Sequence, residues 1–521
     1  MRKGSVEGSI RSRRGERAWI YGLGILTGVI GGLVAVAYRA LAAWLEGRRG
    51  GFLSRAEGGF ALRAALWLAV VAAAGALTAF LVRKLPHIKG SGIPQVRATL
   101  MRRISPDWRL ELPAKFSGGV LALGAGLSLG REGPSIQMGA LAGSGIARVA
   151  AKPELERYLV TAGAAAGISA AFNAPLAGVL FCLEELHRNV SPVMLTCAMA
   201  SAFAANAVSW ILLGNAPVFA LGLGPSLPLR LYPSILLVGL CAGLLGKLFN
   251  TGLLRGQVLA ARAVRSEALR VAAAFVAAGS VALVLPALTG GGHLLVDEAA
   301  AGGLSVRVLA LLLAGKFLFT IFCYSSGSPG GIFLPMLVMG ALLGGIFGQG
   351  LEAAGLAEGF GPNYVVLGMV AFFTAVVRAP ITAAILISEM SGSFAHFPAL
   401  ILVSVAASLT AGLLGSEPIY DSLLARLVPE PRAPKEEGTV VLHVPVLEGS
   451  ALGSCEKARD CMPDGAVLVG VLRGEEERLP RADMAIHPGD VLEILAAEGE
   501  ASEIKERLLG LARPAKGSVE A

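Results

Sequence analysis

Apolar residues fill long stretches over most of the chain, and the lengths of these stretches divide them into two classes. Six stretches are long enough to cross a bilayer as a single helix, which takes about 20 residues. They lie near residues 18–45, 61–83, 192–213, 232–255, 267–288 and 304–323. Near the carboxyl end, apolar and polar residues begin to alternate instead. The pattern therefore predicts a helical membrane body followed by a small domain that contains strands.

Shorter apolar pieces occupy residues 109–186 and 325–427, where glycine and proline cut the chain into segments of roughly 10 to 18 residues. Backbone that is interrupted at membrane depth is stable only where protein or a polar cavity supplies the missing hydrogen bonds. We therefore expect these pieces to lie inside the protein and to line a site.

The second half of the chain repeats features of the first half. Three motifs recur in the same order, two at an offset of 201 residues and one at 205: Lys115-Phe116 as Lys316-Phe317, Pro134-x3-Met138-Gly139-Ala140-Leu141 as Pro335-x3-Met339-Gly340-Ala341-Leu342, and Ala174-Pro175 with Glu184 as Ala379-Pro380 with Glu389. This order predicts two structural repeats, about 18–225 and 226–427, whose broken helices meet at a binding site. Inverted repeats are the commoner arrangement for sites at the midplane of a membrane.

Composition and charge support this division. Hydrophobic residues make up 54% of the chain and charged residues only 16%, against about 25% charged residues in soluble domains, which excludes a wholly soluble, disordered or fibrous protein. Residues 1–428 carry a net charge of +15 and residues 429–521 a net charge of −7. The first 17 residues form a basic segment with no cleavable signal, so we expect the amino terminus to be cytoplasmic.

The six cysteines indicate neither a disulfide framework nor a zinc site. They are Cys182, Cys197, Cys241, Cys323, Cys455 and Cys461. The first four lie in apolar runs, where cysteine behaves as a small hydrophobic residue. Cys455 and Cys461 are close enough in sequence to pair, but we expect them to be free. The sequence also indicates no metal, no cofactor and no nucleic-acid partner.

Three glycine-rich turns open helices in the interrupted regions. They are Gly90-Ser91-Gly92-Ile93-Pro94, Gly130-Arg131-Glu132-Gly133-Pro134 and Gly330-Gly331-Ile332-Phe333-Leu334-Pro335. Glycine permits the tight turn and proline suits the first helical turn, which leaves free N–H groups at a partly positive helix start. Such helix starts attract anions.

The energetics decide how many helix starts an anion site needs. Moving a bare ion into a medium of low dielectric costs on the order of 20 kcal/mol. Half a unit charge at 4 Å returns only about 2 kcal/mol at an effective dielectric of 20. We therefore expect three converging helix starts, together with hydroxyl and amide donors, to form one anion site. For any single turn the alternative is that glycine merely allows close helix packing.

Acidic residues occur at two places in the interrupted regions. Glu132 lies at the start of its own helix, where an ionised carboxylate would compete with an anion and a protonated one would release the site. Its alternative role is to cap that helix, although a carboxyl group in a membrane segment generally indicates a function. Glu184 and Glu185 end a short apolar helix, with side chains about 100° apart, so at most one should face a proton route. Their alternative role is a solvated helix end.

These motifs resemble the CLC family of chloride channels and proton/chloride antiporters, of the prokaryotic type. GSGIP at 90–94, GREGP at 130–134 and GIFLP at 331–335 are similar to the three segments of the family's selectivity filter. The resemblance covers about residues 18–427 and includes KFSGG, FNAPLAGVLFCLEE and EPIY. It implies an all-α polytopic membrane protein with two inverted repeats and a midplane anion site, assembled as a homodimer in the prokaryotic inner membrane with both termini cytoplasmic.

The resemblance also implies roles for particular residues. The Ser91 and Tyr420 hydroxyls and the Ile332 and Phe333 amides correspond to chloride ligands. Glu132 corresponds to the external gating glutamate, and Glu185 to the internal glutamate that transfers protons. An acid at position 185 favours an antiporter, and serine at position 91 favours chloride over nitrate as the transported ion. The remaining filter residues are those of the three turns, Gly90–Pro94, Gly130–Pro134 and Gly331–Pro335.

The acidic carboxyl-terminal region follows a linker at 428–437 and precedes a tail at 513–521. Alternation of polar and apolar residues over 438–512 predicts a small cytoplasmic α+β domain. This region is similar to the TrkA-C type of regulatory module, which implies a small ligand; the alternative is an appendage that stabilises a dimer. We expect Glu475, Glu476 and Glu477 to form a solvated turn.

Taken together, the sequence predicts a transporter that exchanges chloride for protons in contact with the lipid bilayer. The alternative on the same scaffold is a passive chloride channel in which Glu132 acts only as a gate. A membrane hydrolase that uses Ser91 or Ser135 lacks an evident base among the six histidines, so we expect no enzyme activity. A cation carrier would leave the three helix starts unexplained.

Overall fold

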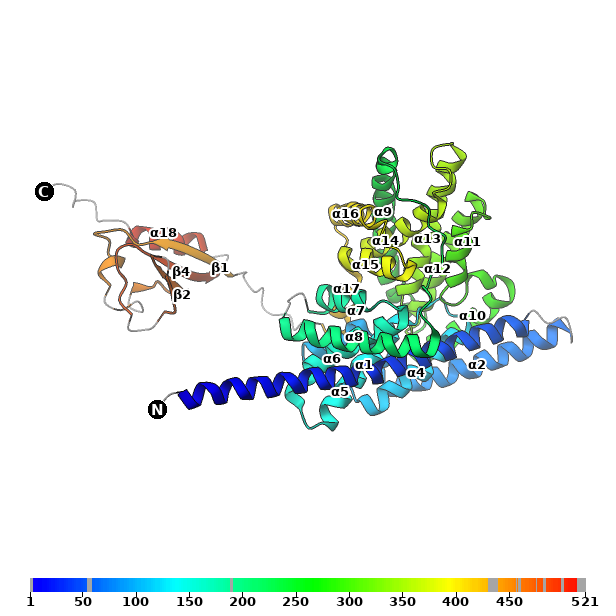
Figure 1. Cartoon of the computed structure of the whole chain (residues 1–521), viewed down its shortest axis with the longest axis horizontal. Coiled ribbons are helices and arrows are strands. Elements are labelled where there is room, and N and C mark those ends of the chain that lie inside the picture. Colours follow the sequence, from blue (N-terminus) through cyan, green and yellow to red (C-terminus); the bar gives the residue numbers. More distant parts are fainter. Residues whose placement is uncertain are drawn as a thin grey trace. The chain divides into compact units, whose positions relative to one another are not determined.

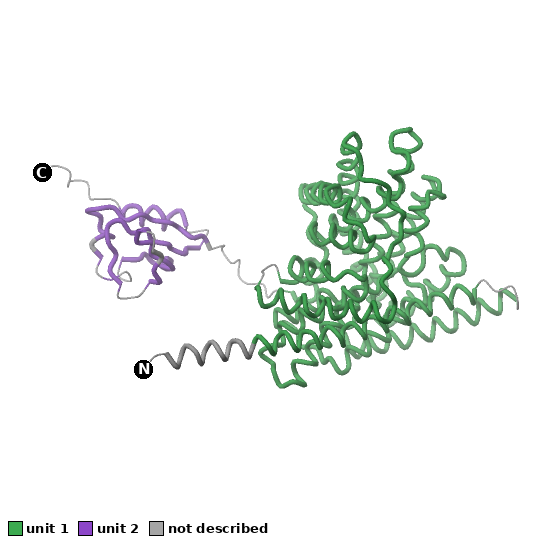
Figure 2. The backbone as a smooth tube through the Cα atoms, in the orientation of Figure 1, with its two compact units in different colours: residues 1–429 green, residues 430–521 purple. Residues whose placement is uncertain are grey.

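The computed structural model describes residues 3–53, 59–187, 191–429, 439–455, 457, 461–474, 476–480, 484–497 and 501–512. The chain divides into two compact units, residues 1–429 and residues 430–521 (Figure 2). The larger unit is helical, and the smaller unit contains all the described strands (Figure 1).

The larger unit contains α1 to α17. Their bounds are α1 (Lys3–Leu53), α2 (Phe60–Lys84), α3 (Ile93–Leu100), α4 (Trp108–Ala125), α5 (Glu132–Val149), α6 (Glu156–Phe172), α7 (Pro175–Phe181), α8 (Pro192–Leu213), α9 (Tyr232–Ala263), α10 (Glu267–Val284), α11 (His293–Ala300), α12 (Val306–Ser325), α13 (Phe333–Ala353), α14 (Gly361–Val377), α15 (Pro380–Ser391), α16 (Phe397–Leu413) and α17 (Ile419–Leu427). A π-helical turn, η3 (Cys182–His187), continues α7, and short 3-10 turns occur at η1 (Pro86–Ile88), η2 (Pro153–Leu155), η4 (Leu229–Leu231) and η5 (Pro286–Leu288).

Within the described residues, seven helices are long and apolar enough to cross a membrane. Six of them correspond to the predicted long stretches. The seventh is α13, so the prediction of only short interrupted pieces over residues 325–427 is wrong at this helix. Its glycines do not end the helix, because they serve close packing: a Cβ on Gly340 would lie 2.5 Å from the Gly368 carbonyl oxygen of α14, and one on Gly344 would overlap the Tyr364 carbonyl oxygen.

The same kind of contact joins α5 to α6 in the first half of the chain. A Cβ on Gly139 would overlap the Gly163 carbonyl oxygen, and a Cβ on Gly163 would overlap that of Gly139. Gly139 and Gly340 are the glycines of the repeated Met-Gly-Ala-Leu motif. The repeated sequence therefore forms the same backbone contact in both halves.

The helices α7 and α15 make a reciprocal pair of contacts. Glu389, at the end of α15, accepts hydrogen bonds from the Leu176 amide at 3.1 Å and the Ala177 amide at 2.8 Å, in the first turn of α7. Glu184, just after α7, accepts from the amide of Thr382 at 2.9 Å and from its hydroxyl at 2.7 Å, in the first turn of α15. Each helix thus begins where the other supplies a carboxylate.

The smaller unit is an antiparallel four-stranded sheet in the order β1-β4-β2-β3, together with α18. Its elements are β1 (Thr439–Pro445), η6 (Leu452–Ser454), β2 (Ala466–Arg473), β3 (Glu476–Arg478), β4 (Asp490–Ala497) and α18 (Ala501–Ala512). Alternate residues of β1 and β4, including Val444 and Ile494, pack with Leu508 of α18 in its core.

The predicted solvated turn of three glutamates is wrong in part. Glu476 and Glu477 lie in β3 and pair with Arg473 and Leu472 of β2. The chain reverses directly after β2 at Gly474, which has φ +66°. The turn therefore ends before Glu476, where β3 begins. Glu475 lies outside the described residues.

An ion pair between the half-buried Arg473 and the buried Asp490 joins β2 to β4 in this unit. Arg473 donates hydrogen bonds to both carboxylate oxygens of Asp490, at 2.7 and 2.8 Å. Burial acts to raise the pKa of Asp490, but the hydrogen bonds from Arg473 and from the His487 amide hold it below its ordinary value.

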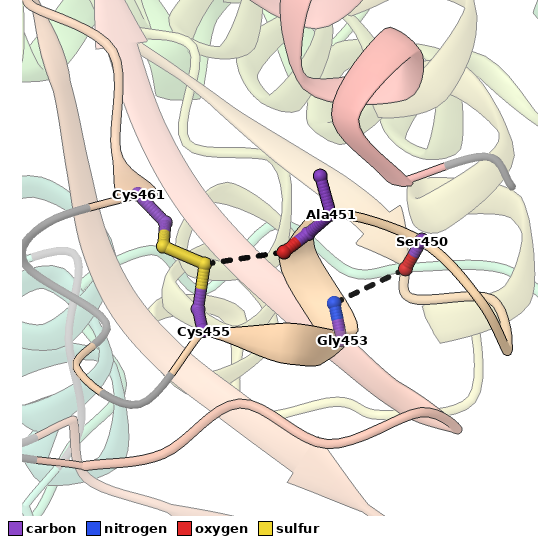
Figure 3. The surroundings of a disulfide bond; sticks show 5 residues. All are labelled: Ser450, Ala451, Gly453, Cys455 and Cys461. Carbon is purple, nitrogen blue, oxygen red and sulfur yellow. Dashed lines mark hydrogen bonds between the residues drawn. A yellow bond between two sulfur atoms is a disulfide. The ribbon is translucent and has the colours of Figure 1, made fainter. Parts of the chain in front are cut away.

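The expectation that Cys455 and Cys461 are free is also wrong. The two residues form a disulfide, and their Cα atoms lie 6.4 Å apart (Figure 3). In the preceding turn the Gly453 amide donates to the Ser450 hydroxyl at 3.1 Å, and η6 ends directly before Cys455. Spacing in the sequence does not show whether two cysteines lie within bonding distance.

Candidate anion and proton site

The three glycine-rich turns lie together in the larger unit. The Gly90 amide donates to the Ser328 carbonyl at 3.2 Å, and the Gly330 amide donates to the Gly90 carbonyl at 3.0 Å. Gly130 and Gly331 exchange two backbone hydrogen bonds, of 2.6 and 2.8 Å. The starts of α3, α5 and α13 therefore converge, although more than 200 residues separate the first turn from the third.

Glycine allows this close approach at two positions in particular. Gly92 precedes α3 with φ +93°, in the left-handed region that favours glycine. A Cβ on Gly133, in the first turn of α5, would lie 2.6 Å from both the carbonyl oxygen and the hydroxyl oxygen of Ser91. A side chain at either position would force the turns apart.

The predicted hydroxyl ligands are buried beside these helix starts. Ser91 is 1% exposed and Tyr420 is fully buried. Neither hydroxyl forms a well-aligned hydrogen bond with a residue that the structure describes. The Ser91 and Tyr420 hydroxyls lie within hydrogen-bonding reach of each other, and the charges of Glu185 and Glu132 act on the Tyr420 hydroxyl. Two buried hydroxyl groups with incomplete hydrogen bonding are costly unless a ligand completes it.

The predicted amide ligands open α13. Ile332 precedes the helix and Phe333 is its first residue, and both are buried. The first N–H groups of a helix have no partner within it, so these amides are available to an anion. The Phe333 ring is held between Phe172 and Phe373, with ring centroids 5.0 and 4.6 Å away.

Glu132 is fully buried, and its carboxyl group lies at the same helix starts. A Cβ on Gly130 would overlap the Glu132 Oε2 and would lie 3.0 Å from the Leu334 amide nitrogen. Glycine at position 130 therefore leaves room for the carboxyl group. The Arg131 Nε lies 3.7 Å from Oε1. The backbone amides of Glu132 and Leu334 lie within hydrogen-bonding reach of the carboxyl group, although neither oxygen forms a well-aligned hydrogen bond with a described residue. The carboxyl group therefore occupies the kind of position that an anion would take.

The two adjacent acids after α7 face different partners. Glu185 is 3% exposed and accepts a hydrogen bond from the Arg97 Nη1 at 3.0 Å. Glu184 instead accepts from Thr382, at the start of α15. Of the two, only Glu185 pairs with a residue of α3, the helix that the Ser91 turn opens.

Sequence reasoning missed Arg97. It is buried on α3 and pairs with both Glu185 and Asp421, the residue after Tyr420. The available signal was a charged residue in a short helix directly after the GSGIP motif.

Two buried lysines, which the sequence indicates only as part of the repeated Lys-Phe motif, each hold a turn of the backbone. Lys115 donates to the Ile88 and Gly90 carbonyls at 2.8 and 2.7 Å, and so holds the turn that carries Ser91. Lys316 donates to the Leu288 and Gly290 carbonyls at 3.0 and 2.7 Å. Both side chains are fully buried. The repeated Lys-Phe motif thus fixes an equivalent turn in each half.

The fold and the site define a class of protein: a multi-span membrane protein whose interrupted helices direct their amino-terminal ends toward one buried site. Residues 74–412 match the family described as Voltage gated chloride channel, and the chain belongs to this family. In the described part of the chain, no group of three or more His, Cys, Asp or Glu residues is arranged to hold a metal ion.

Several known proteins are similar to this chain. The H(+)/Cl(-) exchange transporter ClcA of Salmonella paratyphi A is 36% identical over 416 residues, which cover 77% of this chain and 87% of that protein. ClcA of Cronobacter sakazakii is 36% identical over 453 residues, which cover 84% of this chain and 95% of that protein. The crystal structure of a slow cyanobacterial Cl−/H+ antiporter superimposes with a TM-score of 0.75 at 29% identity, covering 80% of this chain and 99% of that one.

Proposed function

We propose that the protein exchanges chloride for protons across a membrane. The observation that carries this proposal is the convergence of three helix starts beside two buried hydroxyls and one buried carboxyl group, none of which forms a well-aligned hydrogen bond with a described residue. The similarity to H(+)/Cl(-) exchange transporters supports the choice of ions.

In this proposal, chloride binds between the hydroxyls of Ser91 and Tyr420 and the amides of Ile332 and Phe333. The helix starts and hydroxyl donors replace part of the water that the ion loses. Glu132 is the gate, because its ionised carboxylate competes with chloride for the same donors. Protonation removes that charge, and the carboxyl group then leaves the site to the anion.

Protons enter from the cytoplasmic side through Glu185 in this mechanism and pass on to Glu132. The charges of both acids act on the buried Tyr420 hydroxyl, which supports a route that passes near this residue. Both ions use Glu132, so the movement of one requires the movement of the other. This shared carboxyl group is what makes the protein an exchanger rather than a passive chloride channel.

Chloride and proton fluxes measured together in liposomes test the proposal. Glu132→Gln should retain chloride flux and reduce proton flux to background, because the amide cannot carry a proton. Glu185→Gln should reduce proton flux and spare chloride flux. Glu352→Gln, at an exposed acid on the last turn of α13, is the control and should behave as wild type.

Two outcomes would contradict the proposal. Proton-coupled transport at the wild-type level in Glu132→Gln would exclude a shared carboxyl group. A wild-type reversal potential that follows chloride alone, unchanged by a pH gradient, would indicate the passive channel.

The proposal extends to the architecture around the site. The reciprocal contacts of α7 with α15 support an inverted relation between repeats 18–225 and 226–427. We also propose a homodimer with one pore per subunit, located in the inner membrane of a prokaryotic cell, with both termini cytoplasmic. Residues 438–512 would then be a TrkA-C-like regulatory domain that binds a small ligand. Chemical crosslinking and ligand-dependent flux test these points.

A further inference from the structure

An apolar groove lies between α1 and α2 and shares no lining residue with the proposed anion site. Both helices pack against α4, and α4 from Leu121 to Ala125 forms the floor of the groove. The cavity measures about 460 Å³. The wall from α2 consists of Leu66, Trp67, Val70, Val71 and Ala74. This helical spacing places one continuous apolar face along the groove.

Basic residues gather at one end of this groove. Arg48 and Arg49, in the last turns of α1, line it. Arg63 lies on α2 one turn before Leu66 and Trp67, on the same helix face. Since α1 and α2 are consecutive and only residues 54–59 join them, the end of α1 lies near the start of α2. The three arginines therefore lie at the same end of the groove.

These arginines differ in how their charge is satisfied. Arg49 donates to the Leu123 and Gly124 carbonyls at 3.0 and 3.3 Å and also interacts with Glu46. Arg48 lies over the Trp44 ring at 5.2 Å, which leaves its hydrogen-bond donors available. The Nε and Nη1 of Arg63 are buried, and no described residue accepts a hydrogen bond from them. Buried guanidinium donors without a partner indicate a missing acceptor.

The groove opens toward lipid. Both helices are long and apolar enough to span the membrane, so their joined ends lie at one membrane surface. On α2, Leu62, Leu66 and Val70 are 64%, 52% and 61% exposed. Such apolar exposure at these positions fits contact with acyl chains.

We propose that this groove binds one anionic glycerophospholipid of the surrounding bilayer. An acyl chain lies along the apolar wall of α2, and the phosphate accepts hydrogen bonds from Arg48 and Arg63. Arginine suits this role because its planar donors match phosphate oxygens. Free phosphate would leave the apolar part of the cavity empty, and a zwitterionic lipid would add a second positive charge beside the arginines. The proposal does not depend on which ions the protein transports.

Native mass spectrometry of the purified full chain tests the charge requirement. The protein is mixed in detergent with phosphatidylglycerol or with phosphatidylcholine, and bound lipid is counted. Wild type should retain phosphatidylglycerol preferentially. The double variant Arg48→Gln/Arg63→Gln should retain about tenfold less of it, as expected for the loss of hydrogen bonds to a charged group. Arg83→Gln, an exposed arginine at the other end of α2, should retain as much as wild type.

A second pair of variants tests the shape of the site without changing its charge. Ala74→Trp fills the groove and should lower phosphatidylglycerol retention, whereas Ala73→Trp, on the exposed face of α2, should not. Equal retention of the two lipids by wild type would overturn the proposal. Equal losses in Ala74→Trp and Ala73→Trp, or in the double variant and Arg83→Gln, would also overturn it. Because bound lipid is the readout, failure here is distinct from failure of ion exchange.

Discussion

At the scale of single residues, Arg97 connects the proposed proton route to the proposed anion site. Its guanidinium pairs with Glu185 after α7 and with Asp421 of α17, and it lies on the helix that the Ser91 turn opens. An ion pair this deeply buried is maintained only when its geometry and hydrogen bonds are good, and removal of one partner leaves an uncompensated charge. We infer that Arg97 is a positioning residue that holds the Glu185 carboxylate in place.

Replacing Arg97 tests this role. Arg97→Met should lower proton flux about tenfold, the loss expected when a hydrogen bond to a charged group is removed, while chloride flux falls less. Arg97→Lys keeps the charge and should recover part of the proton flux. Both fluxes are measured in the same liposomes. Equal reduction of the two fluxes in Arg97→Met, without recovery in Arg97→Lys, would indicate that Arg97 only supports the fold.

At the scale of elements, short interrupted helices are stabilised by side chains from the other half of the chain. The helix α7 has only seven residues, and its second and third amides donate to Glu389 of α15. A helix this short is not stable in isolation. The contacts that Glu389 and Glu184 supply are therefore part of what keeps α7 and α15 in place beside the site.

Removal of one of these carboxylates should destabilise the protein measurably. Glu389→Ala leaves two amides of α7 without their acceptor, and we expect a loss of about 0.5–2 kcal/mol, as for other helix caps. Glu389→Gln keeps one acceptor oxygen and should lose less. Thermal unfolding in detergent measures both variants, with Glu352→Ala, at an exposed position, as the control. A Glu389→Ala melting temperature equal to that of the control would contradict the capping role.

At the scale of the whole molecule, the chain is two units with separate hydrophobic cores. The core of the helical unit extends from Tyr38 to Leu423, and that of the smaller unit from Leu442 to Ala512. Their net charges are opposite in sign. A separate core allows each unit to fold without the other.

Truncation after Pro429 tests this independence. The shortened chain keeps every residue of the proposed ion site, so we expect its chloride and proton fluxes to stay within about twofold of those of the full chain. Flux is normalised to the amount of folded protein in the liposomes. Loss of coupled transport from a well-folded truncated protein would show that the smaller unit is required for transport.

The sequence by itself determined the features that depend on neighbouring residues. Long apolar stretches are sufficient to locate membrane helices, and six of the seven spans in the described part of the chain follow from them. Glycine followed by proline is sufficient to locate helix starts, and α3, α5 and α13 begin within the three predicted turns. Alternating polarity was sufficient to predict strands in the smaller unit.

Only the tertiary structure decided which of these parts meet. The convergence of the turns at Gly90, Gly130 and Gly331, the pairing of Arg97 with Glu185 and Asp421, and the groove between α1 and α2 all join segments that local patterns do not connect. The same limit explains the errors at α13 and at the Cys455–Cys461 disulfide. Glycine in the local sequence predicts a helix break, whereas in α13 it allows close contact with α14. The pairing of two cysteines depends on their separation in space, which their spacing in the sequence does not give.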